Sequence, residues 1–176
     1  FCEGDSDVFI LQQAFCKLYN TSDFFGNLVE LRGGSGASGV AASIKYSNEN
    51  IISIGILDRD KEGIDQFEAL KKNSNFVVNC NNENLISKQN TKNNCCLLLP
   101  VPSFRNEMAD FFQDNTFIEY LFDNNALISM GVELEQKTGN TYFTIKGVKK
   151  NNKLNFDKQK HQVVSNVREL NSHDFY

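Results

Sequence analysis

The stretch Ile51–Leu57 consists almost entirely of apolar residues, and Asp58 and Asp60 follow it directly. An apolar run of this length is typical of a strand that is buried on both faces of a parallel sheet. Strand-like and helix-like patterns alternate around this run in the first half of the chain. The alternation predicts βαβ crossovers and an α/β fold with a mainly parallel sheet flanked by helices.

The predicted elements follow this alternation to about residue 100 and then change character. The expected strands are Phe1–Glu3, Asn27–Leu31, Ile51–Leu57, Phe76–Cys80 and Cys95–Leu99, and the expected helices begin near Ser6 and cover Ser38–Tyr46 and Ile64–Lys72. The asparagine-rich stretch Asn81–Asn94 is expected to be a loop. The later part is expected to form a helix at Asn106–Asp123, a hairpin of Leu127–Leu134 with Tyr142–Ile145, and a helix at His161–Leu170.

Composition excludes several classes of protein. The 176 residues are 40% hydrophobic and 23% charged, and no apolar run reaches the about 18 residues of a membrane span. The net charge of −4 excludes a uniformly basic nucleic-acid binder but not a local basic strip. The five cysteines are odd in number and contain no C-x-x-C, so we expect reduced thiols in a cytoplasmic protein rather than a disulfide framework or zinc site. Because the chain starts with Phe1, we also expect further sequence upstream.

Acidic residues follow two of the predicted strands. Glu3 ends the first strand and Asp7 lies four residues later, while Asp58 and Asp60 follow the Ile51–Leu57 strand. The carboxyl ends of neighbouring parallel strands meet at one edge of a sheet, where ligands usually bind. Four carboxylates there repel one another unless a cation is present, and Mg²⁺ prefers such oxygen ligands. A solvated turn is the other interpretation of the D-x-D pattern alone.

These motifs, taken in order, resemble the Toprim domain of topoisomerases, primases, maturase-like ribonucleases and nucleases of the OLD (overcoming lysogenization defect) type. The resemblance covers about residues 1–100 and rests on E-G-x-x-D at Glu3–Asp7, the glycine-rich turn at Gly33-Gly34, and apolar-D-x-D-x-x-G at Ile51–Gly63. The glycine-rich turn lacks the Lys-Ser/Thr of a phosphate-binding P-loop. The resemblance implies a Rossmann-like Toprim core over residues 1–100. Residues 101–176 would be an α+β extension that completes the nuclease site within a single compact unit.

The resemblance also implies roles for individual residues. Glu3 would be the catalytic glutamate and a metal ligand, Asp58 and Asp60 would hold Mg²⁺ or Mn²⁺, and Asp7 would be a further acidic ligand. Glu119, in an I-E-x-x-apolar segment, would serve a second metal, the alternative being an exposed helical glutamate. Lys158 or Lys160 would act near the scissile phosphate. Both lie in the stretch 146–160, whose six lysines and one aspartate suit either a phosphate backbone or a solvated loop.

The expected function is therefore Mg²⁺-dependent hydrolysis of nucleic-acid phosphodiester bonds, and the resemblance to OLD-type nucleases places it in bacterial anti-phage defence. The partner would be DNA or RNA, and the family context allows an ATPase partner or upstream domain and an oligomer, with no membrane. The alternative is a non-catalytic nucleic-acid-binding or regulatory Toprim module of a larger complex. A phosphatase fits less well, because D-x-D-x-T/V would stand early in the chain, whereas Lys61 and Glu62 follow Asp60.

Overall fold

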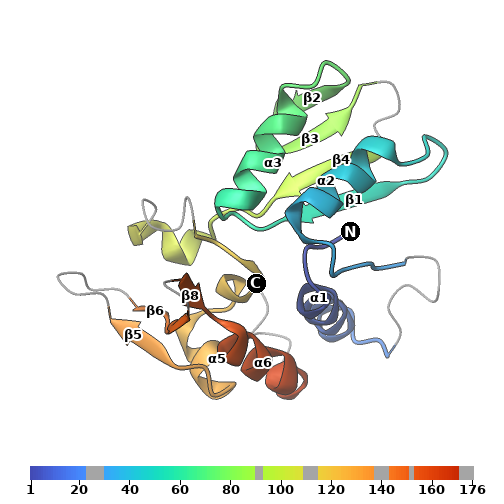
Figure 1. Cartoon of the computed structure of the whole chain (residues 1–176). Helices are drawn as coiled ribbons and strands as arrows, with labels where there is room; N and C mark the ends of the chain where they lie inside the picture. The colour runs from blue at the N-terminus through green and yellow to red at the C-terminus, as the bar shows by residue number, and fades with distance from the viewer. Residues whose placement is uncertain (23–29, 90–92, 109–114, 137–142, 151–152, 171–176) are drawn as a thin grey trace. The chain divides into compact units, whose positions relative to one another are not determined.

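The computed structural model describes residues 1–22, 30–89, 93–108, 115–136, 143–150 and 153–170 (Figure 1). The chain divides into two compact units. The first unit comprises Phe1–Val8 and Glu30–Ile118, and the second comprises Phe9–Val29 and Glu119–Tyr176. Helix α1 (Asp5–Leu18) spans the division and begins one residue before the expected start at Ser6.

The first unit contains a four-stranded sheet in the order β1-β4-β3-β2. Its strands are β1 (Ser53–Leu57), β2 (Phe76–Asn79), β3 (Asn82–Lys88) and β4 (Asn94–Leu98). β1 and β4 run parallel, whereas β3 is antiparallel to both β4 and β2. The fold is thus a mixture of helices and strands as expected, but the sheet is mixed rather than mainly parallel.

The predicted first strand is an extended segment that continues the sheet beyond β1. The Phe1 nitrogen donates to the Ile54 oxygen at 2.7 Å, and the Ile56 N–H donates to the Phe1 oxygen at 2.8 Å. One residue bonded to two alternate residues of its neighbour is the pattern of a parallel pair. On its other side, the Cys2 N–H donates to the Arg32 oxygen at 2.8 Å. The segment therefore lies between β1 and the chain near Arg32.

Helices α2 (Gly36–Tyr46) and α3 (Lys61–Lys71) pack on the same face of this sheet (Figure 1). The close approach of α2 depends on Gly55 in β1. A Cβ atom at Gly55 would lie 2.7 Å from Ile44 Cγ1 and 2.9 Å from Val40 Cγ1. The core under the two helices consists of apolar residues from every strand and from both helices: Ala37, Val40, Ala41, Ile44, Leu57, Phe67, Leu70, Phe76, Ile86, Cys96 and Leu98.

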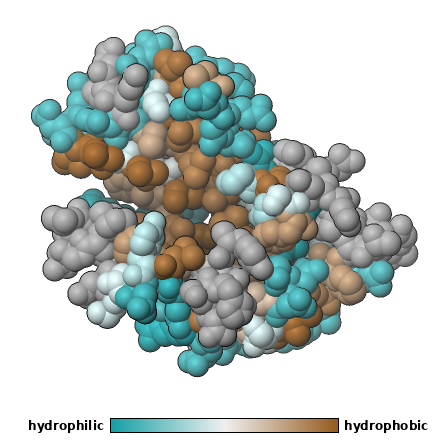
Figure 2. Space-filling view, turned by 180° about the vertical axis from the view of Figure 1, so that it is seen from behind, coloured by the Kyte–Doolittle hydropathy of each residue, from teal (hydrophilic) through white to brown (hydrophobic). Residues whose placement is uncertain are grey.

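Strand side chains alternate in direction, so the opposite face of the sheet also carries apolar residues. Ile54 is 50% exposed and Val77 is 49% exposed. In the view from behind, brown hydrophobic side chains interrupt the teal surface (Figure 2). None of the helices in the described parts of the chain has the length and apolar run that a membrane span needs.

The prediction of a loop at Asn81–Asn94 is wrong, because half of this stretch is strand β3. Asparagine side chains accept backbone hydrogen bonds at the turn and in the first residues of the strand: the Asn81 N–H donates to Asn79 Oδ1 at 2.9 Å, and the Asn84 N–H donates to Asn82 Oδ1 at 3.0 Å. β3 pairs on both sides, with β2 and with β4, and its Ile86 is fully buried. Pairing with two neighbours outweighs the low strand propensity of asparagine.

The predicted continuous helix at Asn106–Asp123 is also wrong over its described residues. The structure has short 3₁₀ helices, η2 (Ser103–Met108) and η3 (Ile118–Leu121), with residues 109–114 outside the described parts. Between them Thr116 forms an antiparallel bridge with Arg59, which fixes an extended conformation there. The backbone hydrogen bonds of Thr116 therefore go to Arg59 instead of to a helix.

The second unit combines small hairpins with helices. Its further elements are α5 (Asn124–Ser129), β5 (Leu134–Gln136), β6 (Phe143–Ile145), β7 (Val148–Lys150), β8 (Lys153–Asn155), α6 (Asp157–Asn166) and η4 (Val167–Glu169). β5 and β6 pair antiparallel, but the predicted first strand Leu127–Leu134 is wrong except at Leu134, where β5 begins, and residues 127–129 are helical. β7 and β8 form a second hairpin within the lysine-rich stretch, which the sequence interpretation missed.

Candidate active site: an acidic edge of the sheet

Two segments that are far apart in sequence join at the carboxyl edge of the sheet. Glu3 ends the extended segment beside β1, and Asp58 directly follows β1. The Asp58 N–H donates to Glu3 Oε1 at 2.8 Å. This hydrogen bond fixes one carboxylate directly against the backbone of the D-R-D segment, as the parallel arrangement of the two segments predicts.

The chain adds successive segments to opposite sides of the sheet from this point. From the segment of Phe1–Glu3 the chain passes to the neighbouring residues near Arg32, on the side away from β1. From β1 it eventually reaches β4, on the opposite side. Glu3 and Asp58 thus flank a topological switch point, the position at which open α/β sheets usually form their ligand crevice.

Two other aspartates are held at this edge by helix starts. Asp7 is 5% exposed, and its Oδ2 accepts the Gly4 N–H at 2.8 Å, which is half of a capping box at the start of α1. Asp60 is the N-cap of α3, and its Oδ1 accepts the Gly63 N–H at 2.8 Å. Each carboxylate therefore has a structural task as well as a charge.

Two glycines allow the backbone segments to approach each other here. A Cβ atom at Gly63 would lie 1.9 Å from the Asp58 carbonyl oxygen and 3.2 Å from Glu3 Oε1. A Cβ atom at Gly33 would lie 2.4 Å from the Gly4 carbonyl oxygen. These are the glycines of the D-x-D-x-x-G pattern and of the glycine-rich turn, and their role here is close backbone packing around Glu3.

The electrostatics of this edge are those of crowded acids. Burial raises the pKa of Glu3 to about 7, the Asp58 N–H opposes this shift, and the charges of Asp60, Asp7 and Glu62 raise the pKa further. Burial also raises the pKa of the Cys2 thiol to about 11; the positive Phe1 amino group opposes this, and Asp7, Asp58 and Glu3 add to it.

We refer to Glu3, Asp7, Asp58, Asp60 and Glu62 as the acidic edge. Glu62 was not among the residues singled out from the sequence, although its position in the first turn of α3 placed it beside Asp60.

The acidic edge does not form a ready-made cage for an ion. Within the described part of the chain, no three His, Cys, Asp or Glu side chains are arranged so that they could hold a metal ion. Backbone N–H groups instead occupy one oxygen each of Glu3, Asp7 and Asp60. Carboxylate oxygens do lie at this edge of the sheet, but three of these side chains accept hydrogen bonds from backbone N–H groups instead of converging on one point.

The remaining predicted site residues belong to the second unit. Glu119 is fully buried in η3, and its Oε2 lies 3.8 Å from Lys160 Nζ of α6. The structure thus pairs a predicted metal ligand with a predicted catalytic lysine. Sequence periodicity could not show this pairing, because the two residues lie on separate elements.

Lys158 takes part in a different ion-pair group. Its Nζ lies 2.6 Å from Glu133 Oε1, and Lys146 Nζ lies 3.1 Å from Glu133 Oε2. These contacts hold the pKa of Glu133 below its ordinary value, first through the hydrogen bond from Lys158 and then through that from Lys146. Part of the positive charge of the lysine-rich stretch is therefore neutralised by Glu133, a residue outside the stretch.

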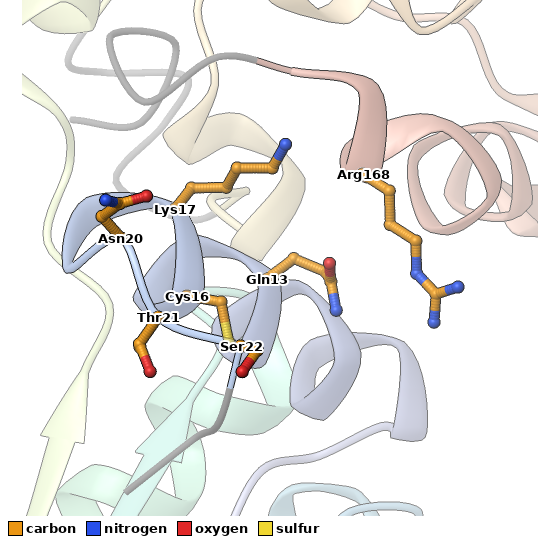
Figure 3. A pocket seen from close by; sticks show the side chains of 7 residues that line it. All are labelled: Gln13, Cys16, Lys17, Asn20, Thr21, Ser22 and Arg168. Carbon is orange, nitrogen blue, oxygen red and sulfur yellow. The ribbon is translucent and has the colours of Figure 1, made fainter.

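The second unit also contains a cavity of about 520 Å³ at the end of α1, bordered by Lys17 and by Arg168 of η4. Figure 3 shows the Lys17 ammonium and the Arg168 guanidinium extending in different directions rather than toward a common point. Arg168 instead lies over the ring of Phe9, at 4.9 Å from its centroid. None of the predicted site residues borders this cavity.

Comparison of the chain with protein-family models, with characterised proteins and with solved structures finds no match.

Proposed function

We propose that this chain is a divalent-metal-dependent phosphodiester hydrolase of the Toprim type that acts on nucleic acid, with its metal at the acidic edge. The observation that carries the proposal is the junction of Glu3 with Asp58 at the switch point of the sheet, with Asp7 and Asp60 held beside them. The resemblance of these segments to Toprim motifs supports the same assignment. Anti-phage defence is part of the proposal through that resemblance alone.

The residues present fit Mg²⁺ by their chemistry. Burial raises the pKa of Glu3 most, and the negative charges of Asp60, Asp7 and Glu62 raise it further. Because these acids repel one another, the site favours an added positive charge. Mg²⁺ usually takes one or two carboxylates and keeps water and substrate phosphate as its other ligands, so it needs no protein cage of three side chains. Asp58 and Asp60 would hold it, with Glu3 and Asp7 adding negative charge beside them. When bound, the metal supplies Lewis-acid stabilisation of the phosphoryl oxygens and an activated water.

The residues of the chain have their own tasks in this proposal. Glu3 keeps its Oε1 on the Asp58 N–H, so a proton taken up near neutral pH would reside on Oε2. A carboxyl group with a pKa of about 7 is suited to exchange a proton with substrate or water at neutral pH. Asp60 orients the start of α3 through its cap, which keeps the D-R-D segment and Glu62 in place.

The lysines of the second unit are proposed as contacts to the phosphate backbone. Lys158 and Lys146 share the carboxylate of Glu133, whose two oxygens receive one lysine each. A phosphate group could replace this carboxylate with the same two contacts, and charge-assisted bonds to phosphate are strong. The burial of Glu119 against Lys160 favours a structural ion pair, so our proposal includes neither a second metal at Glu119 nor Lys160 as a catalytic group.

One observation favours the alternative, a nucleic-acid-binding or regulatory Toprim module without catalysis. The acidic edge lacks three converging metal-ligating side chains among the described residues. In such a module the carboxylates would serve only as caps and braces.

A cleavage assay separates the two functions. Labelled single-stranded DNA, duplex DNA and RNA would each be incubated with the wild type and Mg²⁺ or Mn²⁺, with Asp58→Asn as the matched variant and EDTA as the metal-free control. The nuclease proposal expects cleavage of at least one substrate that requires metal and is lost in Asp58→Asn while nucleic-acid binding persists. Binding without cleavage in any metal condition would support the regulatory module.

A further inference from the structure

Arg59, between the two aspartates of the D-R-D segment, is a buried charge to which the proposed hydrolysis assigns no role. Its side chain is only 9% exposed. Its Nε donates to the Leu99 carbonyl oxygen at 2.7 Å, and a terminal nitrogen donates to Asn84 Oδ1. Leu99 follows β4 and Asn84 belongs to β3, so one guanidinium joins the D-R-D segment to two other strands.

The backbone of Arg59 is fixed as well. Its N–H donates to the Thr116 oxygen at 2.6 Å, and the Thr116 N–H donates back to the Arg59 oxygen at 2.8 Å. The Leu99 N–H in turn donates to the Leu57 oxygen at 2.9 Å. Leu99 is therefore bonded through its N–H to the end of β1 and through its oxygen to Arg59.

Burying a guanidinium is costly, and an apolar side chain of similar volume is often as stable or more stable at such a position. Packing alone therefore does not account for an arginine here. The planar guanidinium offers several donors in a fixed geometry, which a lysine cannot reproduce. The segment it holds carries two carboxylates beside Glu3 and Asp7, and like charges push such a segment away from its neighbours unless it is braced.

We propose that Arg59 is a positioning residue that holds Asp58 and Asp60 at the acidic edge in the absence of metal, so that these two carboxylates are already in place when a cation arrives. Its effect on metal binding rests on the proposed function; its effect on the D-R-D segment does not. The reporter for the segment is the Asp58 N–H, whose bond to Glu3 Oε1 depends on the position of the segment.

The test compares Arg59→Met, Arg59→Lys and Asn84→Ala with the wild type, using Ile86→Val as a control that weakens the same sheet at its buried core. Hydrogen exchange of the Asp58 amide is measured by NMR on the metal-free protein, and Mn²⁺ affinity is measured by calorimetry. Arg59→Met is expected to accelerate Asp58 exchange and to weaken Mn²⁺ binding, each by about tenfold or more. Arg59→Lys is expected to recover part of both effects, whereas Ile86→Val changes neither.

Asn84→Ala keeps the test decisive if Arg59→Met does not fold, because it removes one partner of the guanidinium and leaves the charge in place. Unchanged Asp58 exchange in every folded variant of Arg59 and Asn84 would overturn the inference, as would faster exchange with unchanged Mn²⁺ affinity. If the wild type binds no Mn²⁺, the proposed function fails, and the Asp58 exchange rates alone decide whether Arg59 positions the segment.

Discussion

Asp7 and Asp60 of the acidic edge each combine an oxygen that accepts a backbone N–H with a negative charge, and substitution can separate the two. Asparagine keeps the acceptor oxygen and is as good an N-cap as aspartate, whereas alanine removes both properties. Asp60, which caps α3 through the Gly63 N–H, is the clearest case. The charge is what the proposed function uses, and the cap is what the fold uses.

We therefore expect different results from two variants of Asp60. Asp60→Ala should lower the free energy of unfolding by about 1 kcal/mol, and Asp60→Asn should change it by less than about 0.5 kcal/mol. Both should weaken Mn²⁺ binding. Urea unfolding and Mn²⁺ titration of the two proteins test this, and equal stability losses would show that the charge of Asp60 itself supports the fold.

The raised pKa of Glu3 predicts a pH dependence with a definite sign. The ordinary pKa of 4.5 applies to the unfolded chain and about 7 to the folded protein, so between these pH values the folded state keeps a proton that the unfolded chain has lost. This contribution to stability is complete below pH 4.5 and is lost as the pH rises through 7. The variant Glu3→Gln keeps an acceptor for the Asp58 N–H but cannot titrate.

Unfolding measured from pH 4 to 8 without metal should therefore show the wild type losing stability relative to Glu3→Gln over this window. Mg²⁺ should reduce the difference by favouring the ionised form of Glu3. Parallel pH curves for the two proteins would mean that the Glu3 carboxyl titrates normally.

Among the elements, those with a strong local signal could be predicted and those that depend on distant partners could not. The apolar runs located β1 and β4 to within two residues, and the helix predicted at Ser38–Tyr46 is α2, which begins two residues earlier at Gly36. β3 was missed because its asparagines have turn propensity, while its pairing with β2 and β4 is a tertiary effect. The bridge between Thr116 and Arg59 likewise could not be predicted from the local sequence, because the two residues lie far apart in the chain.

The candidate site divides along the same line. The proximity of Glu3 and Asp58 could be predicted, because the carboxyl ends of neighbouring parallel strands meet at one edge of a sheet. The Glu119–Lys160 pair and the hydrogen bonds of the Arg59 guanidinium could not be predicted in this way, because both depend on how side chains from separate elements meet.

The junction of β1 with α3 makes a prediction at the element scale. Gly63→Ala places a Cβ 1.9 Å from the Asp58 carbonyl oxygen, so either α3 or the D-R-D segment must move. We expect a loss of about 1–3 kcal/mol in stability together with weaker Mn²⁺ binding. Gly36→Ala is the control: its φ of +64° makes alanine strained, but nothing lies within 4 Å of the added Cβ, so Mn²⁺ binding should persist. Unaltered Mn²⁺ binding in Gly63→Ala would contradict this account of the junction.

The whole molecule consists of two units that use charged residues differently. In the first unit, acids gather at a sheet edge. In the second, carboxylates are matched by lysines of α6, one pair buried and one exposed. Exposed pairs contribute little to stability, whereas removing one partner of a buried charge is costly.

Two neighbouring lysines of α6 test this contrast. Lys160→Gln removes a charged partner of the fully buried Glu119 and should lower stability by roughly 1–3 kcal/mol. Lys158→Gln removes an exposed partner of Glu133 and should cost less than about 1 kcal/mol. If the order of the two losses in thermal or urea unfolding is reversed, the buried pair does not stabilise the second unit.

The most direct test of the central claim is Mn²⁺ binding to the folded protein, followed by electron paramagnetic resonance. We expect that the wild type binds Mn²⁺, that Mg²⁺ displaces it, and that Asp58→Asn together with Asp60→Asn weakens binding at least about tenfold while the protein stays folded. If the wild type binds no Mn²⁺, or the doubly substituted protein binds it as tightly, the acidic edge is not a metal site and the proposed hydrolase mechanism is wrong.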